Sequence, residues 1–250
     1  MKYAEILETA PTEIIQSKTY YHGTPTKSAA MSILEKGIHP DFNSIHNGFL
    51  NSVKGRVYIT SDLSYALPYV TWHDCFGEVS WQIPYDENKK KFDKMMTVNR
   101  KMERYGYLFV ISGKKILDDI QPDEDQVGEL LYLIINENDG ISIKVNNLPL
   151  DKAFGDSQLK QELLNLANKY LAKSTLDKVK QHNLKYYSKA AKVLLKRLSD
   201  DAKSKMIEYG FNLAHEGVIY PDKCYQIDKT KIGYIKKDGS NFKEYAVEIK

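Results

Sequence analysis

Six residues of this sequence are of types suited to binding a flat, positively charged group or to stabilising positive charge. A tyrosine ring attracts such a group through stacking and cation–π interaction, worth about 0.5 to 2 kcal/mol per ring. A carboxylate stabilises positive charge that develops at a reacting centre. Histidine donates or accepts a hydrogen bond, and glycine lets a bound molecule approach the backbone. The candidate residues are His22, Gly23, Thr24, Tyr58, Tyr69 and Glu216.

Several common functional motifs are absent from the sequence. It contains no Gly-rich Walker loop, no G-x-G-x-x-G, no G-x-S-x-G and no C-x-x-C. Their absence argues against kinases, dehydrogenases, serine hydrolases and zinc ribbons. The pair His215-Glu216 begins like a zinc-protease helix, but residue 219 is isoleucine, so the second histidine ligand is missing. We therefore predict that the site holds no metal ion.

The candidate residues occur in a characteristic order along the chain. Tyr21-His22-Gly23-Thr24 comes first, the segment Gly55-Arg56-Val57-Tyr58-Ile59-Thr60 follows, and Tyr69 lies eleven residues after Tyr58. The segment Leu213-Ala214-His215-Glu216-Gly217-Val218-Ile219-Tyr220 comes late. In this order the segments resemble the ADP-ribosyltransferase superfamily, in its poly(ADP-ribose) polymerase and diphtheria-toxin-like branch. The resemblance covers roughly residues 20 to 70 and 211 to 232.

The resemblance implies that NAD is the substrate and that its nicotinamide ring lies between Tyr58 and Tyr69. It also implies that His22 hydrogen-bonds the adenosine ribose and that Gly23 lets the backbone approach the nicotinamide amide. Thr24 contributes to NAD binding on the same grounds. The predicted reaction transfers ADP-ribose from NAD to an acceptor and releases nicotinamide.

The same resemblance makes Glu216 the catalytic carboxylate, at the head of an expected strand over residues 217–220. It would orient the ribose hydroxyls and stabilise the oxocarbenium-like ribose. Glu129, in the acidic segment 123–129, is the alternative, although an acidic residue before an apolar run is also typical of a helix N-terminus. Family members that modify arginine carry a glutamate or glutamine two positions before the catalytic one, where this chain has Ala214. An arginine-modifying toxin is therefore disfavoured.

Strands and helices must place these residues. Pro25 near its start and Gly37 at its end predict a helix after the His-Gly-Thr segment. A second strand and helix are predicted at residues 56–60 and 62–70, with Ser61 or Asp62 as the cap. Further strands are expected at residues 79–83, 107–111, 141–145, 217–220, 225–227 and 245–249. The Lys-rich segment 88–101 is expected to be a surface loop.

A basic helical region is expected over residues 158–209, where apolar residues recur every three and four positions. We predict three helices that end at Gly210. Residues 151–205 carry 13 Lys and Arg against 6 Asp and Glu, a balance of +7, which leaves −4 for the rest of the chain. Such a surface attracts polyanions, although a solvated lysine face is the commoner explanation. The basic charge favours RNA or DNA as the acceptor, with protein as the alternative.

Composition predicts an ordinary folded chain, since 42% of the residues are hydrophobic and 28% charged. The longest apolar run, residues 130–135, is far shorter than the roughly 20 residues of a membrane-spanning helix. An acidic N-terminal segment without an apolar block argues against a signal peptide. We therefore expect a cytoplasmic protein without membrane contact, in which Cys75 and Cys224 are unpaired thiols.

These patterns predict an α+β fold that resembles the ADP-ribosyltransferase split β-sandwich. We expect a single domain over residues 1–250 with a basic helical insertion at about residues 151–210. Family analogy also suggests a toxin or phage-conflict effector that an inhibitory antitoxin protein restrains. One rival is an RNA 2′-phosphotransferase, which shares the His-Gly-Thr strand but needs an arginine-rich phosphate site, and this chain has four arginines. The other is a non-catalytic interaction module whose tyrosines form core and whose Lys-rich helices bind a partner.

Overall fold

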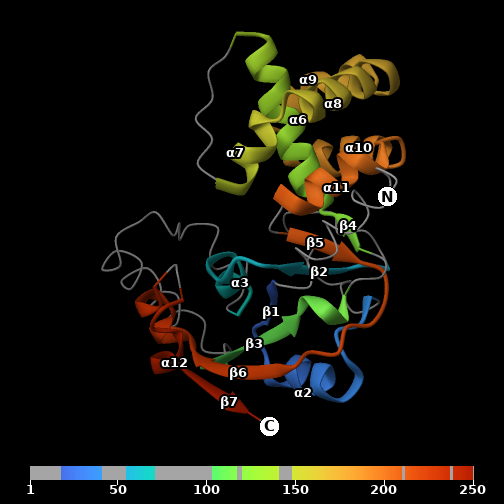
Figure 1. Cartoon of the computed structure of the whole chain (residues 1–250). Helices are drawn as coiled ribbons and strands as arrows, with labels where there is room; N and C mark the ends of the chain where they lie inside the picture. Colours follow the sequence, from blue (N-terminus) through green and yellow to red (C-terminus); the bar gives the residue numbers. More distant parts are fainter. Residues whose placement is uncertain are drawn as a thin grey trace, which may run out of the picture. The chain divides into compact units, whose positions relative to one another are not determined.

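The structure, a computed structural model, describes residues 18–40, 55–70, 103–116, 120–140, 148–209, 212–236 and 239–249 (Figure 1). The chain forms two compact units. Among the described residues, the first unit takes in 40, 55–58, 120–140, 148–209 and 212–216. The second takes in 18–39, 59–70, 103–116, 217–236 and 239–249. Helices and antiparallel strands are both present, which confirms the α+β prediction.

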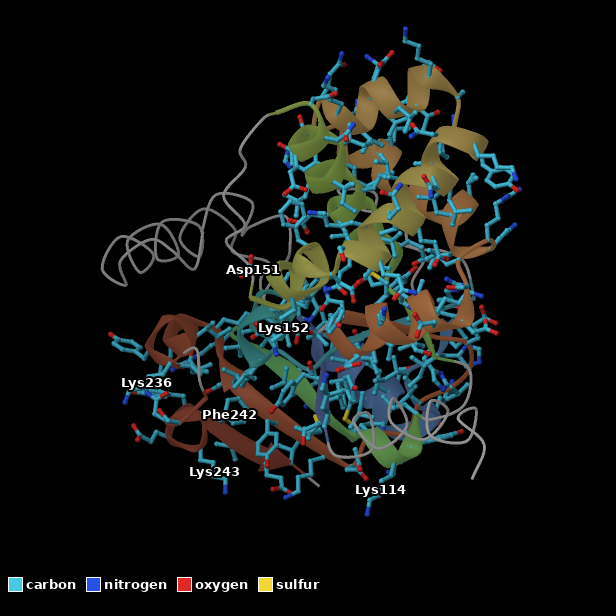
Figure 2. The ribbon with its side chains drawn as sticks, turned by 45° about the horizontal axis from the view of Figure 1, so that its top comes forward. Lys114, Asp151, Lys152, Lys236, Phe242 and Lys243 are labelled. Carbon is cyan, nitrogen blue, oxygen red and sulfur yellow. The ribbon has the colours of Figure 1, made fainter. Side chains whose placement is uncertain are left out.

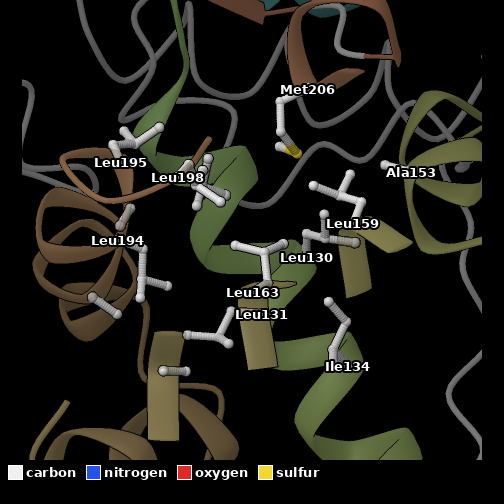
Figure 3. Close-up of a cluster of buried hydrophobic side chains, with 14 of the residues drawn as sticks. Leu130, Leu131, Ile134, Ala153, Leu159, Leu163, Leu194, Leu195, Leu198 and Met206 are labelled. Atoms are coloured by element: carbon white, nitrogen blue, oxygen red, sulfur yellow. The ribbon is translucent and has the colours of Figure 1, made fainter. Parts of the chain in front are cut away.

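Helices dominate the first unit. Among the described residues these are α6 (Glu124–Asn138), α7 (Leu148–Gly155), α8 (Ser157–Tyr170), α9 (Lys173–Lys180), α10 (Leu184–Leu195) and α11 (Asp200–Tyr209). Leucine, isoleucine and alanine side chains from all six fill one buried core, part of which Figure 3 shows. Because α6 packs most extensively against α10, the helical group begins well before residue 151. The prediction of one domain with an insertion at 151–210 stays a prediction.

The prediction of three helices over residues 158–209 is wrong, since α8, α9, α10 and α11 occupy this segment. The breaks between them contain neither glycine nor proline. At one break His182 adopts the left-handed backbone region with a φ of 58°. At another, Ser199 accepts a hydrogen bond from the backbone of Ala202 and starts α11. Apolar periodicity reports which face of a helix is buried, and it does not locate breaks of this kind.

The first unit also contains short strands. β4 (Ile120–Pro122) pairs with β5 (Asn212–His215) in antiparallel register, with Ile120 opposite His215. β5 is also the neighbour of β2 (Val57–Thr60). The boundary between the units falls within β2, after Tyr58. All four residues of β5 are buried.

In the part of the chain that the structure describes, the second unit holds β1 (Thr19–Thr24), β3 (Tyr105–Ser112), β6 (Lys223–Asp228) and β7 (Ala246–Ile249). With β2 they follow the order β2-β1-β3-β6-β7, and each pairing is antiparallel. The helices are α2 (Lys27–Lys36), α3 (Leu63–Val70) and α12 (Phe242–Tyr245), with 3₁₀ turns η2 (Gly113–Lys115) and η3 (Lys229–Tyr234). A second buried core lies between α3, β3, β6 and the C-terminal elements.

Local signals place most of these elements correctly. Thr26 caps α2 by accepting a hydrogen bond from the backbone of Ala29, and Gly37 ends it with a φ of 79°. Asp62 begins α3, because its carbonyl accepts the first helical hydrogen bonds. The predicted strands near 107–111, 225–227 and 245–249 are confirmed with shifted ends. The predictions for residues 79–83, 88–101 and 141–145 lie outside the described residues.

The predicted strand over residues 217–220 is wrong. Only Ile219 makes a β-bridge there, with Ile38. The strand is β5, at Asn212–His215, so Glu216 follows a strand instead of heading one. Gly217 has a φ of 140° and Pro221 follows four residues later, which prevents a regular strand between them.

Two further expectations concern membranes and cysteines. No helix in the described part of the chain is both long enough and apolar enough for a membrane crossing. Cys224 lies buried in β6 as a free thiol, and burial raises its pKa to about 12. A thiol with so high a pKa is a poor nucleophile, so Cys224 is a core residue. Cys75 lies outside the described residues.

Candidate functional site

Two candidate site residues of the first unit, Arg56 and Tyr58, lie two positions apart at the start of β2. Successive side chains of a strand point to opposite faces, so Arg56, just before β2, and Tyr58 share one face. Val57 points to the other face and is completely buried. Arg56 and Tyr58 are half-buried. The alternation of apolar and polar residues that predicted the strand therefore also sets the direction of its polar side chains.

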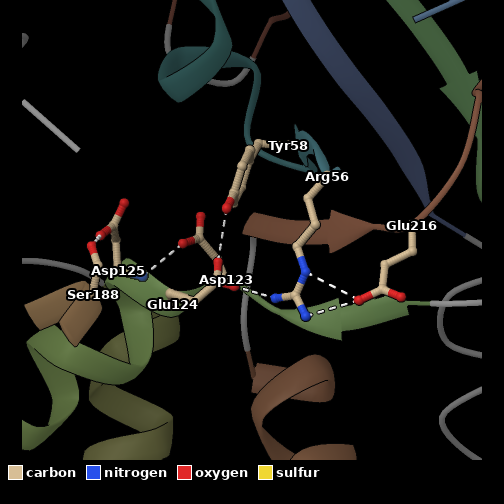
Figure 4. A network of polar contacts seen from close by, with 7 residues as sticks. All are labelled: Arg56, Tyr58, Asp123, Glu124, Asp125, Ser188 and Glu216. Atoms are coloured by element: carbon tan, nitrogen blue, oxygen red, sulfur yellow. Dashed lines mark hydrogen bonds and ion pairs between the residues drawn. The ribbon is translucent and has the colours of Figure 1, made fainter. Parts of the chain in front are cut away.

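Both side chains reach Glu124, the first residue of α6 (Figure 4). The Tyr58 hydroxyl donates a hydrogen bond of 3.0 Å to Oε2 of Glu124. Nη1 of Arg56 forms an ion pair with Oε1 of the same carboxylate. The Glu124 side chain is 3% exposed. A carboxylate at this position also faces the positive end of the helix dipole, which stabilises it.

Arg56 also holds Glu216, which follows the last residue of β5. Nη2 and Nε of Arg56 lie 2.9 Å and 3.2 Å from Oε1 of Glu216. The Glu216 side chain is 54% exposed, and its Oε2 has no hydrogen-bond partner among the described residues. One guanidinium therefore connects a buried carboxylate with an exposed one. We call the residues Arg56, Tyr58, Glu124 and Glu216 the Arg56 network.

Chemically, the Arg56 network presents a fixed carboxylate and a fixed tyrosine ring. Arg56 restrains one oxygen of Glu216 and leaves the other directed to solvent or to a bound molecule. The hydrogen bond to Glu124 restrains the rotation of the Tyr58 ring. A restrained carboxylate stabilises a nearby positive charge without first reorganising, which is the requirement for electrostatic catalysis.

Two more carboxyl groups flank Glu124 at the start of α6. Asp123 caps the helix by accepting a hydrogen bond of 2.8 Å from the backbone of Asp125. The Ser188 hydroxyl donates to the Asp125 carboxylate at 2.8 Å. Burial, with a contribution from Asp125, raises the pKa of Asp123 to about 8, and burial also raises the pKa of Asp125.

A raised carboxyl pKa makes stability depend on pH. Between the unfolded pKa and the folded pKa, folded Asp123 keeps a proton that the unfolded chain has released, so stability falls as the pH rises from 5 to 8. Asp123→Asn keeps the capping oxygen but has no proton to hold. Between pH 5 and 8 we expect its free energy of unfolding to fall by at least about 1 kcal/mol less than that of the unmodified protein. Urea unfolding at several pH values measures the effect. Asp151→Asn is the control, because Asp151 is exposed. If the stability of Asp123→Asn depends on pH as that of the unmodified protein does, Asp123 is not the group that keeps the proton.

The remaining predicted NAD-binding residues belong to the second unit. His22, Gly23 and Thr24 lie on β1, and Tyr69 lies on α3. His22 and Tyr69 are half-buried, whereas Thr24 is 6% exposed. The structure brings Gly23 against α3, because a Cβ on Gly23 would lie 2.8 Å from the Ala66 carbonyl oxygen and 2.9 Å from Cβ of Tyr69. The predicted sandwich of Tyr58 and Tyr69 takes one ring from each unit and stays a prediction.

This contact gives Gly23 a structural role that needs no ligand. We expect Gly23→Ala to lower the free energy of unfolding by about 1 to 3 kcal/mol in the absence of NAD, since the added methyl group pushes α3 away from β1. Thermal and urea unfolding measure this. Gly155→Ala is the matched control, because nothing lies within 4 Å of its added Cβ. If Gly23→Ala keeps full stability but no longer binds NAD, Gly23 serves NAD binding and not the packing of α3 against β1.

Sequence reasoning missed Arg56 and Glu124 as site residues. Arg56 could have been found, because it lies two positions before Tyr58 on an expected strand and so shares its face. Glu124 lies in the acidic segment that predicted Glu129 as the alternative carboxylate. Glu129 lies on α6 with its side chain exposed, and the described contacts do not join it to the Arg56 network.

The described residues contain no group of three or more His, Cys, Asp or Glu side chains that could hold a metal ion. Comparisons with known proteins found no matching family model, no matching curated protein and no matching solved structure.

Proposed function

We propose that this protein is an NAD-dependent ADP-ribosyltransferase. The observation that carries the proposal is the Arg56 network, which joins Tyr58 to Glu216. These two residues are far apart in the sequence, and the family resemblance assigns them to the nicotinamide ring and the adjoining ribose. Glu216 is exposed and oriented, as a group that contacts substrate must be.

In the proposed reaction, the bond between the ribose C1′ and the nicotinamide nitrogen breaks, and nicotinamide leaves with the electron pair as a neutral molecule. Positive charge then develops on the ribose, and the Glu216 carboxylate stabilises it. A nucleophilic oxygen or nitrogen of the acceptor forms the new bond to C1′ and gives up its proton to solvent. The Tyr58 ring face binds the nicotinamide ring before it leaves.

The arrangement of local elements also supports the proposal. The segment His22-Gly23-Thr24 ends β1 and is followed by α2, while Tyr58 lies on β2 and is followed by α3. These are the strand and helix units that the resemblance requires. We propose that the α+β fold is of the ADP-ribosyltransferase type, a split β-sandwich with an added helical region.

The contacts of the arginines weigh against the phosphotransferase rival. Arg56 is engaged by two carboxylates, and Arg104 pairs with Asp228 at 2.7 Å. Carboxylates already compensate both charges, so neither arginine is set up to receive a phosphate group. A non-catalytic module has no evident need for an exposed carboxylate that is held by an arginine.

Release of nicotinamide from NAD tests the proposal. The protein is incubated with NAD, alone and with RNA, DNA or protein as acceptor, and chromatography separates nicotinamide from NAD. We expect nicotinamide in every mixture and more of it with the true acceptor. Calorimetric titration with NAD provides an independent readout. Absence of both nicotinamide release and NAD binding would reject the enzyme and leave the interaction module.

A further inference from the structure

Lysines line one face of α10 and continue to Lys196, the residue that caps its C-terminal end. Lys185, Lys189, Lys192 and Lys196 lie four, three and four residues apart, a spacing that brings their side chains within about 60° of one another around a helix axis. All four are exposed. Their Cα atoms span about 16 Å along the helix, the length of about five phosphates of one nucleic-acid strand. We call these four residues the α10 lysine stripe.

Among the described residues, the α10 lysine stripe lacks the carboxylate partners that several other lysines of the first unit have. Lys160 pairs with Glu137 at 2.5 Å, and Lys205 lies 3.4 Å from Asp156. Within the described part of the chain, no lysine of the stripe has a carboxylate within ion-pair distance. The Lys192 charge opposes the rise in the pKa of Asp125. The sequence explains the difference, because residues 178–199 contain six lysines, one arginine and no aspartate or glutamate.

Aromatic rings lie beside these cations. The Arg197 guanidinium lies 4.5 Å from the centre of the Tyr170 ring, which is 41% exposed. Nζ of Lys189 lies 5.4 Å from the centre of the Tyr186 ring. Tyr186 is half-buried, so Tyr170 is the exposed ring of the two. Cations that neutralise a phosphate backbone, next to an exposed ring on which a base can stack, are the combination that binds single-stranded nucleic acid.

The opposite face of α10 argues against a membrane as the partner. Tyr187, Ala190, Ala191 and Leu194 are buried in the helical core. A helix that lies in a membrane surface inserts its apolar face among the lipids, and here that face is already occupied. The exposed face of α10 therefore offers charge and hydrogen-bond donors with little apolar surface.

We infer that the α10 lysine stripe, with Arg197 and Tyr170, binds single-stranded nucleic acid, with the cations at the phosphates and the Tyr170 ring against a base. The binding itself does not depend on the proposed function. The additional conclusion, that a nucleic acid is the acceptor of ADP-ribose, rests on the proposed function. The stripe would then raise the local concentration of the acceptor without touching NAD.

The test measures binding of a fluorescent single-stranded RNA of about 20 nucleotides, and of DNA of the same sequence, by fluorescence anisotropy. With four phosphate contacts, the affinity is expected to fall about 50-fold between about 50 and 200 mM salt. The triple variant Lys185→Glu, Lys189→Glu, Lys196→Glu should bind at least about tenfold more weakly and show a shallower salt dependence. Lysine and glutamate have similar helix propensities, so α10 should persist, and circular dichroism checks this.

A second triple variant controls for net charge. Lys114→Glu, Lys236→Glu and Lys243→Glu change exposed lysines of the second unit, labelled in Figure 2, by the same total charge. We expect this variant to keep most of the affinity for RNA or DNA. Equal weakening by both triple variants would overturn the inference, as would an unmodified protein that binds neither nucleic acid at low salt. Binding only to vesicles with anionic lipids, or only to acidic protein, would overturn it as well.

NAD turnover without acceptor separates this inference from the proposed function. The α10 triple variant should release nicotinamide at the normal rate while it loses labelling of nucleic acid. If neither the unmodified protein nor any variant releases nicotinamide, the proposed function fails. The measured binding of RNA and DNA still tests the inference about the α10 lysine stripe. If turnover is normal and only proteins become labelled, a nucleic acid is not the acceptor.

Discussion

Glu216→Gln should lower the rate of nicotinamide release at least about a hundredfold, the effect of removing a charge that stabilises a transition state. Glutamine keeps the size of the side chain and an oxygen that accepts from Arg56. The affinity for NAD should therefore stay within a few-fold of normal. Stability should hardly change, because an ion pair with a 54% exposed carboxylate contributes little to folding. Single-turnover kinetics and calorimetric titration measure the two effects separately.

Glu129→Gln is the matched control for this prediction. Glu129 is the other carboxylate that the sequence offers, and it lies exposed on α6. We expect Glu129→Gln to release nicotinamide at a normal rate. Normal turnover in Glu216→Gln with an inactive Glu129→Gln would reverse the assignment of the catalytic acid. Normal turnover in both variants would show that neither glutamate is the catalytic carboxylate.

Arg56→Met should lower the free energy of unfolding by about 2 to 4 kcal/mol, because it leaves the buried Glu124 carboxylate without its cation. Methionine preserves the apolar packing of the arginine stem. The Tyr58 hydrogen bond alone does not compensate a charge whose side chain is only 3% exposed. Urea unfolding at constant pH measures the loss. A loss below about 1 kcal/mol would contradict the described burial of the pair.

A double variant shows whether the unpaired charge causes this loss. Glu124→Gln in the Arg56→Met background removes the charge and keeps a group that accepts from Tyr58. We expect it to recover at least half of the lost stability, with a coupling of about 1 to 3 kcal/mol between the two positions. A double variant no more stable than Arg56→Met would place the cost in packing instead.

Arg56 acts on activity through Glu216, so it is a positioning residue. Once Arg56 is removed, Glu216 keeps its charge but loses the contacts at 2.9 Å and 3.2 Å that restrain it. The rate of the chemical step should then fall while the affinity for NAD changes less. Arg56 thus serves both folding, through Glu124, and the orientation of the exposed carboxylate.

The sequence by itself determined the local elements that carry the candidate residues. The helix after His22-Gly23-Thr24 follows from Pro25 near its start and Gly37 at its end, and β2 follows from alternating apolar residues. These signals are local, since capping and alternation depend on residues within a few positions of each other. The same signals also placed α3 and the two C-terminal strands correctly.

Local signals failed where distant contacts decide the structure. The segment after Glu216 has the apolar residues of a strand, but Asn212–His215 is the strand because it pairs with β4. The number of helices over residues 158–209 was also missed, because apolar periodicity shows which face of each helix is buried in the common core and does not show where one helix ends. Neither a strand partner nor a shared core can be seen within a few residues of sequence.

The Arg56 network was decided only by the tertiary structure. Arg56 and Tyr58 share a face of β2 for local reasons, but Glu124 and Glu216 join them from α6 and from the end of β5. The sequence contains several acidic residues near these positions, and nothing local separates Glu124 from Glu129. What separates them is that the Glu124 carboxylate pairs with the Arg56 guanidinium, whereas the Glu129 side chain is exposed and has no described contact with the network.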